Sequence, residues 1–187
     1  MDTATKSLCR CKWCNPSNPT YIEYHDKEWG VPCYDDKTLL EFLILEPFQA
    51  GLSWEIVLNK REGFRQAFGG YCIDTICNYG TDKVEQLLQD KSIIRNRRKI
   101  EASIWNTKIF REIQKEWGTF SAYLWHFTKG EIQYEIEKTS SELSDCITKD
   151  LKKRGMKFIG TTIIYSYLQA MGVVCSHEKD CFLHKPE

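Results

Sequence analysis

The chain has 187 residues, which fits one domain with a sizeable core, and its formal net charge is zero. A neutral chain is not a general polycation, although it can still carry a local face for nucleic acid. The sequence contains neither an apolar run long enough to span a membrane nor the apolar core of a signal peptide, which predicts a cytoplasmic protein without membrane contact. We expect a monomer with a single domain over residues 1–187, of which residues 1–10 form a flexible N-terminal extension.

The nine cysteines divide into two groups by position. Their odd number and the reducing cytosol favour free thiols or metal ligands over disulfides. Cys72, Cys77 and Cys146 lie in the body of the chain and are interpreted as buried or half-buried small hydrophobes. Most of the others crowd the two ends of the chain, where three of the four histidines also lie: Cys9, Cys11, Cys14, Cys175 and Cys181, with His25, His177 and His184.

Apolar spacing predicts that most of the chain is helical. The expected helices cover residues 36–46 and 53–68, a segment starting near residue 81, and residues 95–117, 121–127, 144–154 and 162–171. Cap-type residues such as Ser53 and a following glycine such as Gly118 agree with these bounds. Residues 131–137 alternate apolar and polar side chains, as a strand or an extended loop would. The predicted fold class is all-α.

Glu46 occupies an unexpected position in the first expected helix. At about 100° per residue, Leu39, Phe42 and Glu46 share one face, whereas Glu41 points away and is expected to be solvated. Pro47 is expected to end the helix, beside the negative end of its dipole. Since an unpaired buried carboxylate costs several kcal/mol or takes up a proton, Glu46 is predicted to have a partner or a function. The alternative is that it caps or salt-bridges a neighbouring element, or reaches out of a frayed end.

Two basic runs, residues 91–99 and 149–157, lie at expected turns between helices. Such runs are usually solvated helix faces. A tight turn also presents backbone N–H groups and the positive end of the next helix, which suits a DNA phosphate. The first turn is therefore a candidate helix-hairpin-helix element, although Lys91 and Ser92 stand where glycine would help the turn. The candidate DNA contacts in the two runs are Ser92, Arg95, Arg97, Arg98, Lys153 and Lys157.

The chain ends carry residues suited to a metal. His177 and Cys181 are four residues apart and would lie on one side of a turn, and with Cys11 and His25 they complete a tetrahedral zinc set. Such a site would be a structural clip between the two ends. Spacing alone leaves open that these residues are unrelated, or that the ligands come from other cysteines and histidines at the ends.

Three long motifs, YIEYHDKEWGVP (residues 21–32), LEPFQAGLSW (residues 45–54) and LKKRGMKFIGTTIIYSYLQAMG (residues 151–172), point to one family. Together they resemble the 3-methyladenine DNA glycosylase I family, over residues 11–181. The resemblance implies the all-α fold of the helix-hairpin-helix glycosylase superfamily and one structural zinc ion. It also implies double-stranded DNA with alkylated bases as partner, and 3-methyladenine as the base that is excised.

The resemblance also implies roles for individual residues. The zinc ligands fall on Cys11, His25, His177 and Cys181, with Cys14 open as an alternative first ligand. Glu46 is implied as the catalytic acidic contact to the base. The aromatic walls of the base site fall on Tyr24 and Trp54, and its other residues are Trp13, Tyr21, Trp29 and Gln49.

Two absences refine the expected mechanism. Other superfamily members use an Asp well downstream of the hairpin, but no Asp occurs here between Asp90 and Asp145. Bifunctional members carry a nucleophilic Lys just after the hairpin. Asn96 stands at that place, with Lys99 nearby, so we expect a monofunctional enzyme without strand cleavage. The competing hypothesis is a non-catalytic, zinc-stabilised module that binds damaged DNA.

Four further side chains are predicted to be structural. Trp105, Trp117 and Trp125 lie on apolar helix faces and are expected in the core. His126 lies between two aromatic residues and is expected to be a structural histidine, not a catalytic base.

Overall fold

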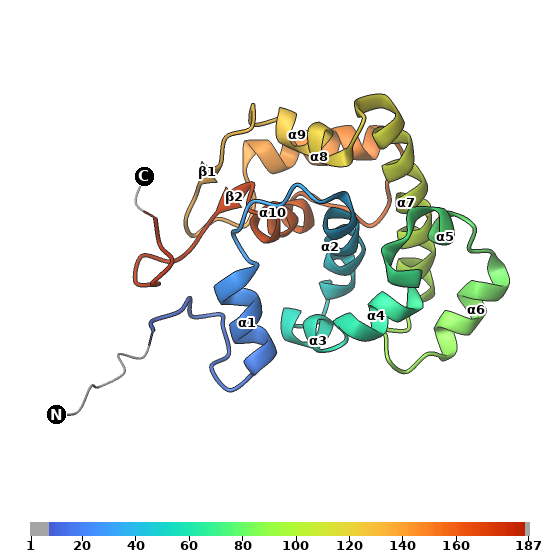
Figure 1. The fold of residues 1–187 in the computed structure, drawn as a ribbon, viewed down its shortest axis with the longest axis horizontal. Coiled ribbons are helices and arrows are strands. Elements are labelled where there is room, and N and C mark those ends of the chain that lie inside the picture. The colour runs from blue at the N-terminus through green and yellow to red at the C-terminus, as the bar shows by residue number, and fades with distance from the viewer. Residues whose placement is uncertain (1–7, 186–187) are drawn as a thin grey trace.

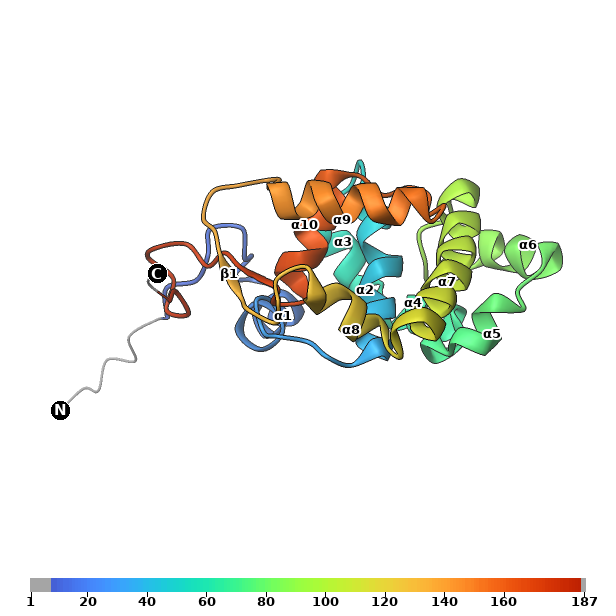
Figure 2. The ribbon, with the colours of Figure 1, turned by 90° about the horizontal axis from the view of Figure 1, so that it is seen from above.

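A computed structural model describes residues 8–185 of the chain. Within them, a bundle of mostly short helices surrounds the long helix α7 and the buried helix α2 (Figures 1 and 2). The elements in chain order are α1 (Pro19–Lys27), α2 (Asp36–Gln49), α3 (Trp54–Asn59), α4 (Arg61–Ala67), a 3-10 turn (Gly69–Tyr71), α5 (Ile73–Cys77), α6 (Thr81–Gln89), α7 (Arg97–Trp117), α8 (Phe120–His126), β1 (Gln133–Tyr134), α9 (Glu142–Lys153), α10 (Thr161–Ala170) and β2 (Val174–Cys175).

Helix α2 forms the centre of the core. Every residue from Leu39 to Phe48 is buried, and the helix packs against α3, α4, α7, α8 and α10. A helix that is covered on all sides has no solvent face, so the direction in which a side chain points does not decide its exposure. The prediction that Pro47 ends this helix was wrong, because the helix runs on to Gln49. Proline only disfavours the helical conformation before it, and here continuation buries Phe48 completely.

The expected helix over residues 53–68 is two helices, α3 and α4, that meet at Lys60. Ser53 caps α3 as predicted, since its hydroxyl accepts from the N–H of Ile56. The bend lets Val57 on α3 and Phe64 on α4 both point into the core. Helices α1 and α5 were not predicted. Helix α6 begins at the expected residue, and α7 to α10 begin and end within about two residues of the expected bounds.

The alternating segment at residues 131–137 contains only the two-residue strand β1, which pairs in parallel with β2. Gln133 lies opposite Val174, and Tyr134 lies opposite Cys175. Figure 1 shows this small sheet at the end of the molecule where the first and last described segments lie, opposite α5 and α6. The chain reaches β2 through Gly172, whose backbone has a φ of +65° and lies against the backbone of Val31.

Several sequence predictions concern exposure. Cys77 is buried as expected, but Cys72 and Cys146 are exposed, because each lies on the outer side of a short helix or at its start. Trp125 is buried and Trp117 packs against the core, whereas Trp105 is 45% exposed and the core prediction for it was wrong. Its indole N–H donates to the carbonyl of Gly155 on the turn after α9, which keeps the ring at the surface.

Residues 1–7 of the predicted flexible extension lie outside the described residues. Next to them, Phe182 donates its N–H to the carbonyl of Cys9, and Arg10 forms an ion pair with Asp26 at 2.6 Å. None of the described helices is long and apolar enough to cross a membrane.

Candidate functional site

A pocket of about 530 Å³ opens at the end of the molecule that carries α1 and the last described segment. Its lining comes from the loops before and after α1, from α1, α2, α3 and α10, and from the residues after β1 and β2. It brings together all the residues predicted for the base site: Trp13, Tyr21, Tyr24, Trp29, Glu46, Gln49 and Trp54. Sequence reasoning missed Ser166 and Gln169, which also line it. The signal was there, because these polar residues are three apart on one side of the apolar helix α10.

Glu46 lies in this pocket and is 3% exposed. Within residues 8–185, no side chain or backbone group forms a hydrogen bond or ion pair with its carboxylate. Burial raises its pKa to about 8. The alternative that Glu46 caps or salt-bridges a neighbouring element therefore has no contact to support it in the described chain. The carboxylate can accept hydrogen bonds from a ligand and can neutralise a positive charge.

Glu41, predicted to be solvated, is also buried. Its carboxylate accepts a hydrogen bond from Nε of Arg61 at 2.7 Å, and Arg65 lies 3.5 Å away. The prediction was wrong because α4 covers the face of α2 that a lone helix would leave to water. The two acids of α2 thus differ in their partners, since Glu41 is paired within the protein and Glu46 is not.

Aromatic rings form the walls around Glu46. The rings of Tyr24 and Trp54 have centroids 5.7 Å apart, and Phe42 lies behind both at 6.0 and 6.1 Å, nearly parallel to each. Burial, together with the charge of Glu46, raises the pKa of Tyr24 well above its ordinary value, so its hydroxyl stays protonated. The indole N–H of Trp54 is buried without a partner in the described structure. Flat rings beside a carboxylate suit a planar, cationic ligand.

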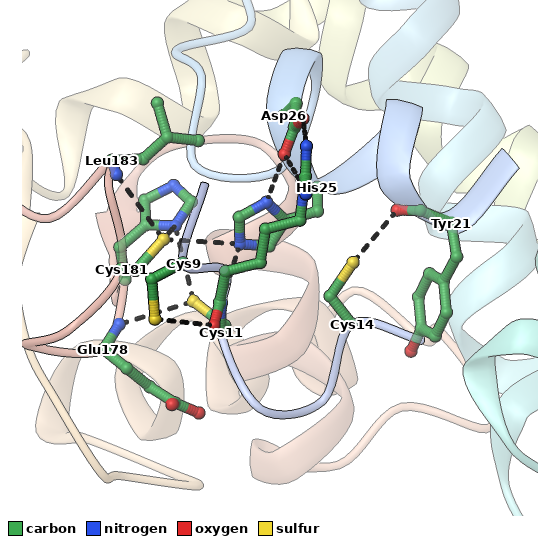
Figure 3. A network of polar contacts seen from close by, with 11 residues as sticks. Cys9, Cys11, Cys14, Tyr21, His25, Asp26, Glu178, Cys181 and Leu183 are labelled. Carbon is green, nitrogen blue, oxygen red and sulfur yellow. Dashed lines mark hydrogen bonds and ion pairs between the residues drawn. The ribbon is translucent and has the colours of Figure 1, made fainter. Parts of the chain in front are cut away.

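Beside the pocket, the four predicted zinc ligands Cys11, His25, His177 and Cys181 form a buried cluster. Figure 3 shows Cys11, His25 and Cys181 of this cluster. Their ligand atoms all lie within 4.8 Å of one another. The sulfur of Cys11 is 3.6 Å from Nδ1 of His177, and the sulfur of Cys181 is 3.5 Å from Nε2 of His25. A tetrahedral zinc ion holds a thiolate sulfur and an imidazole nitrogen roughly 3.5 Å apart, so these separations fit such an ion.

Protonation and neighbouring groups also suit a metal site. Burial lowers the pKa of His177 to about 4, and the adjacent His25 adds to this, which leaves the imidazole neutral and able to bind. Burial raises the pKa of Cys11 to about 12, so a metal would have to displace its proton. Nδ1 of His25 lies 2.8 Å from Asp26, and a carboxylate in this place commonly orients a ligand imidazole.

Cys14, the alternative first ligand, lies outside this cluster. Its sulfur points instead toward the carbonyl of Tyr21, at 3.7 Å, as Figure 3 shows. The cluster also touches the pocket walls, because the ring of Trp29 packs edge-on against His177 at 4.7 Å and Trp13 lies 5.2 Å from His25. The metal-type cluster and the aromatic pocket are therefore one continuous structure.

The predicted DNA contacts differ in whether their side chains already form ion pairs within the protein. Arg95, Arg98, Lys153 and Lys157 are exposed, and the described chain supplies no ion-pair partner for them. Arg97 instead pairs with carboxylates of α6 and α7, the nearer at 2.6 Å.

The two basic turns are built differently. Ser92 donates its hydroxyl to Asp90 and packs so closely on Gly63 that a side chain there would clash. In the second turn, Asn106 of α7 holds Lys157 by two hydrogen bonds to its backbone, at 2.8 and 2.9 Å. Lys157 is therefore fixed beside the helix that begins with Arg97 and Arg98.

Lys99 and His126 have structural contacts. The ammonium of Lys99 is buried and donates to the carbonyls of Phe48 and Ala50, at 3.2 and 2.8 Å. His126 stacks on Trp117 with centroids 4.3 Å apart, and its Nδ1 bonds with the carbonyl of Tyr123. Neither residue lines the pocket.

Comparison with known proteins identifies the relatives of this chain. Residues 13–184 match the methyladenine glycosylase family. DNA-3-methyladenine glycosylase 1 of Escherichia coli (strain K12) is 43% identical over 92% of this chain and 95% of its own. A crystal structure of 3-methyladenine DNA glycosylase I has a TM-score of 0.90 and covers 95% of this chain and 100% of that chain, at 43% identity.

A second solved structure concerns the recognition of 3-methyladenine by 3-methyladenine DNA glycosylase I from Staphylococcus aureus. It is 31% identical, has a TM-score of 0.87 and covers 91% of this chain and 94% of that chain. The family match spans the pocket lining except Lys12, and three of the four cluster residues, so the resemblance read from the three motifs is confirmed. The chain belongs to the methyladenine glycosylase family.

Proposed function

We propose that the protein is a monofunctional DNA glycosylase that excises 3-methyladenine from alkylated double-stranded DNA, as a step of base excision repair. The observation that carries the proposal is Glu46, a buried and unpaired carboxylate among aromatic rings in a pocket. The relatives support it, because they are DNA-3-methyladenine glycosylases and one solved structure concerns recognition of 3-methyladenine itself.

The chemistry of the lesion matches this pocket. Adenine methylated at N3 carries a positive charge, pairs weakly and has a labile glycosidic bond, so the enzyme mainly has to extract the base and hold it. Tyr24 and Trp54 supply faces for stacking and cation–π contact. The positive charge of the lesion favours the ionised form of Glu46. The acid then gives up its proton, accepts from the adenine amino group and balances the charge, whereas neutral adenine does not favour this ionisation. Water then breaks the glycosidic bond and 3-methyladenine is released as the product.

We further propose that Cys11, His25, His177 and Cys181 hold one structural zinc ion. Four protein ligands leave no open position for catalysis. The ion would fix the imidazoles that pack on Trp13 and Trp29, and thereby support the outer wall of the pocket.

We also propose that DNA binds across the two basic turns in a helix-hairpin-helix manner. The exposed Arg95, Arg98, Lys153 and Lys157 are available for phosphate, and Gly160, the N-cap residue of α10, provides no side-chain cap. No lyase activity is expected, because the one lysine near the place of a Schiff-base nucleophile, Lys99, is occupied by two carbonyls.

The direct test is chromatography of the bases that the protein releases from methylated DNA. The expected result is free 3-methyladenine without strand cleavage, and a Glu46→Gln variant that releases much less while binding undamaged duplex as the wild type does. If the wild type binds damaged DNA but releases no base, the protein is a non-catalytic recognition module and the enzymatic proposal fails.

A further inference from the structure

The guanidinium of Arg61, the first residue of α4, contacts α1 and α2, two of the helices that line the pocket. We propose that Arg61 is a positioning residue, which sets the separation of the aromatic walls by tying α1 and α2 to α4. The inference rests on the proposed function of the pocket. Arg61 itself does not line the pocket and is not expected to touch the base.

Arg61 makes contacts to two separate elements. Nη1 donates to both carboxylate oxygens of Glu28, the C-cap residue of α1, at 2.9 and 2.8 Å. Nε donates to Glu41 in the middle of α2, at 2.7 Å. Burial alone would lower the pKa of Arg61, but the hydrogen bonds and charges of these two carboxylates raise it above its ordinary value, so the cation is permanent. One rigid, planar group therefore fixes α1, α2 and α4 relative to one another.

The same guanidinium reaches the pocket walls through one aromatic ring. Its central carbon lies 5.0 Å from the centroid of Phe42, and Phe42 stacks in turn against Tyr24 and Trp54. These two rings come from α1 and α3, so their separation depends on how those helices are held. A change of even 1 Å in such a separation alters stacking on a planar base.

The charges of this group also suit the pocket. Arg61 and Arg65 together balance the two carboxylates Glu28 and Glu41, and the hydrogen bonds of Arg61 go to those two acids and not to Glu46. The protein thus keeps a cation near the site without neutralising the acid that faces the base.

A buried ion pair can also be merely structural, and the chain contains a matched control for that role. Arg154 forms the same kind of group, with Asp150 at 2.7 Å, with Glu116, and with its guanidinium 5.2 Å from the ring of Tyr123. The side chains of Arg61 and Arg154 are similarly buried, at 18% and 24% exposed. Arg154 ties α9 to α7 and lies outside the pocket lining.

The experiment compares Arg61→Met with Arg154→Met. Affinity for free 3-methyladenine is measured by quenching of tryptophan fluorescence, affinity for undamaged duplex by anisotropy, and Tm by calorimetry. Both variants are expected to lose Tm. Only Arg61→Met is expected to lose affinity for the base, by roughly 10- to 100-fold, with unchanged affinity for DNA. Arg61→Lys, which cannot hold two carboxylates in one plane, is expected to recover Tm better than base affinity.

Glu28→Gln provides a milder variant, because Glu28 is the more exposed of the two partners, and it is expected to weaken base binding several-fold. Equal base affinity in Arg61→Met and Arg154→Met at matched loss of Tm would overturn the proposal. Full recovery of both base affinity and Tm in Arg61→Lys would overturn it as well. Failure of the wild type to bind or excise 3-methyladenine would instead refute the proposed function.

Discussion

Replacement of Glu46 by Gln is expected to make the protein more stable at neutral and alkaline pH while it impairs excision. Burial raises the pKa of Glu46 from its ordinary value of 4.5 to about 8. At about 1.4 kcal/mol per pH unit, this difference corresponds to about 5 kcal/mol of destabilisation once Glu46 is ionised in the folded protein. A neutral amide of nearly the same shape does not have this cost.

The dependence on pH has a definite sign. Between pH 4.5 and 8 the unfolded chain has lost the proton of Glu46 while the folded chain still holds it, so the folded state binds more protons. The free energy of unfolding therefore falls as the pH rises through this window, and becomes constant above about pH 8. This is the reverse of the behaviour of a salt-bridged carboxylate.

The assay is urea unfolding, followed by tryptophan fluorescence, of the wild type and Glu46→Gln at half-unit steps from pH 6 to pH 8.5. The stability advantage of the variant is expected to grow by about 2 kcal/mol between pH 6 and pH 8. Over most of this range the folded wild type keeps the proton of Glu46 while the unfolded chain has lost it, and half of the folded molecules are ionised only near pH 8. Asp90→Asn provides a control, since hydrogen bonds with Ser92 lower the pKa of this exposed carboxylate and it adds no change in this range. Parallel curves for wild type and Glu46→Gln would show that Glu46 is an ordinary solvated acid and refute the reasoning.

Three further predictions concern other parts of the chain. His177→Ala should remove about one zinc ion per molecule in metal analysis and weaken base binding, because His177 also packs on Trp29; zinc retained at wild-type level would contradict the ligand set. Gly172→Ala should lower the free energy of unfolding by roughly 3 kcal/mol or more in urea, since its new Cβ would lie 2.2 Å from the backbone of residue 31 at a φ of +65°, and a change under 1 kcal/mol would refute this packing. Arg98→Ala should reduce the salt dependence of DNA binding by about one phosphate contact. Arg97→Ala should reduce it less, because Arg97 already pairs with two carboxylates, and equal effects of the two variants would contradict this difference.

The sequence predicted helices with a clear aliphatic spacing better than helices without one. Helix α7 carries an apolar pattern over many turns, so its bounds followed from spacing and from Gly118 alone. Helix α1 was missed although Asn18 and Pro19 are strong start signals, because its buried face consists of Tyr21, Tyr24 and His25 and not of an aliphatic stripe. The bend at Lys60 could not be predicted, since nothing in the local sequence requires it and packing against α2 decides it.

The pocket shows the same limit. Glu46 stood out because a carboxylate interrupted an apolar stripe, and the structure buries it as that stripe predicted. Glu41 was misjudged because its burial depends on Arg61, twenty residues away in the chain, whose position no periodicity encodes. The cluster at the chain ends joins residues too distant for spacing to choose among nine cysteines. The family resemblance supplied that choice, and the structure places those four residues together.

The joining of Cys11 to Cys181 has a consequence for biosynthesis. A ribosome makes α1 and the first two cluster residues early, but it adds His177 and Cys181 only after every helix of the described fold has been made. All the helices therefore precede the residues that complete the cluster, and Trp29 has to wait for the imidazole that covers it. In a nascent or truncated polypeptide that ends before β2, the pocket around Glu46 would lack the support of His177 for Trp29, and base capture would begin only after His177 and Cys181 have been added.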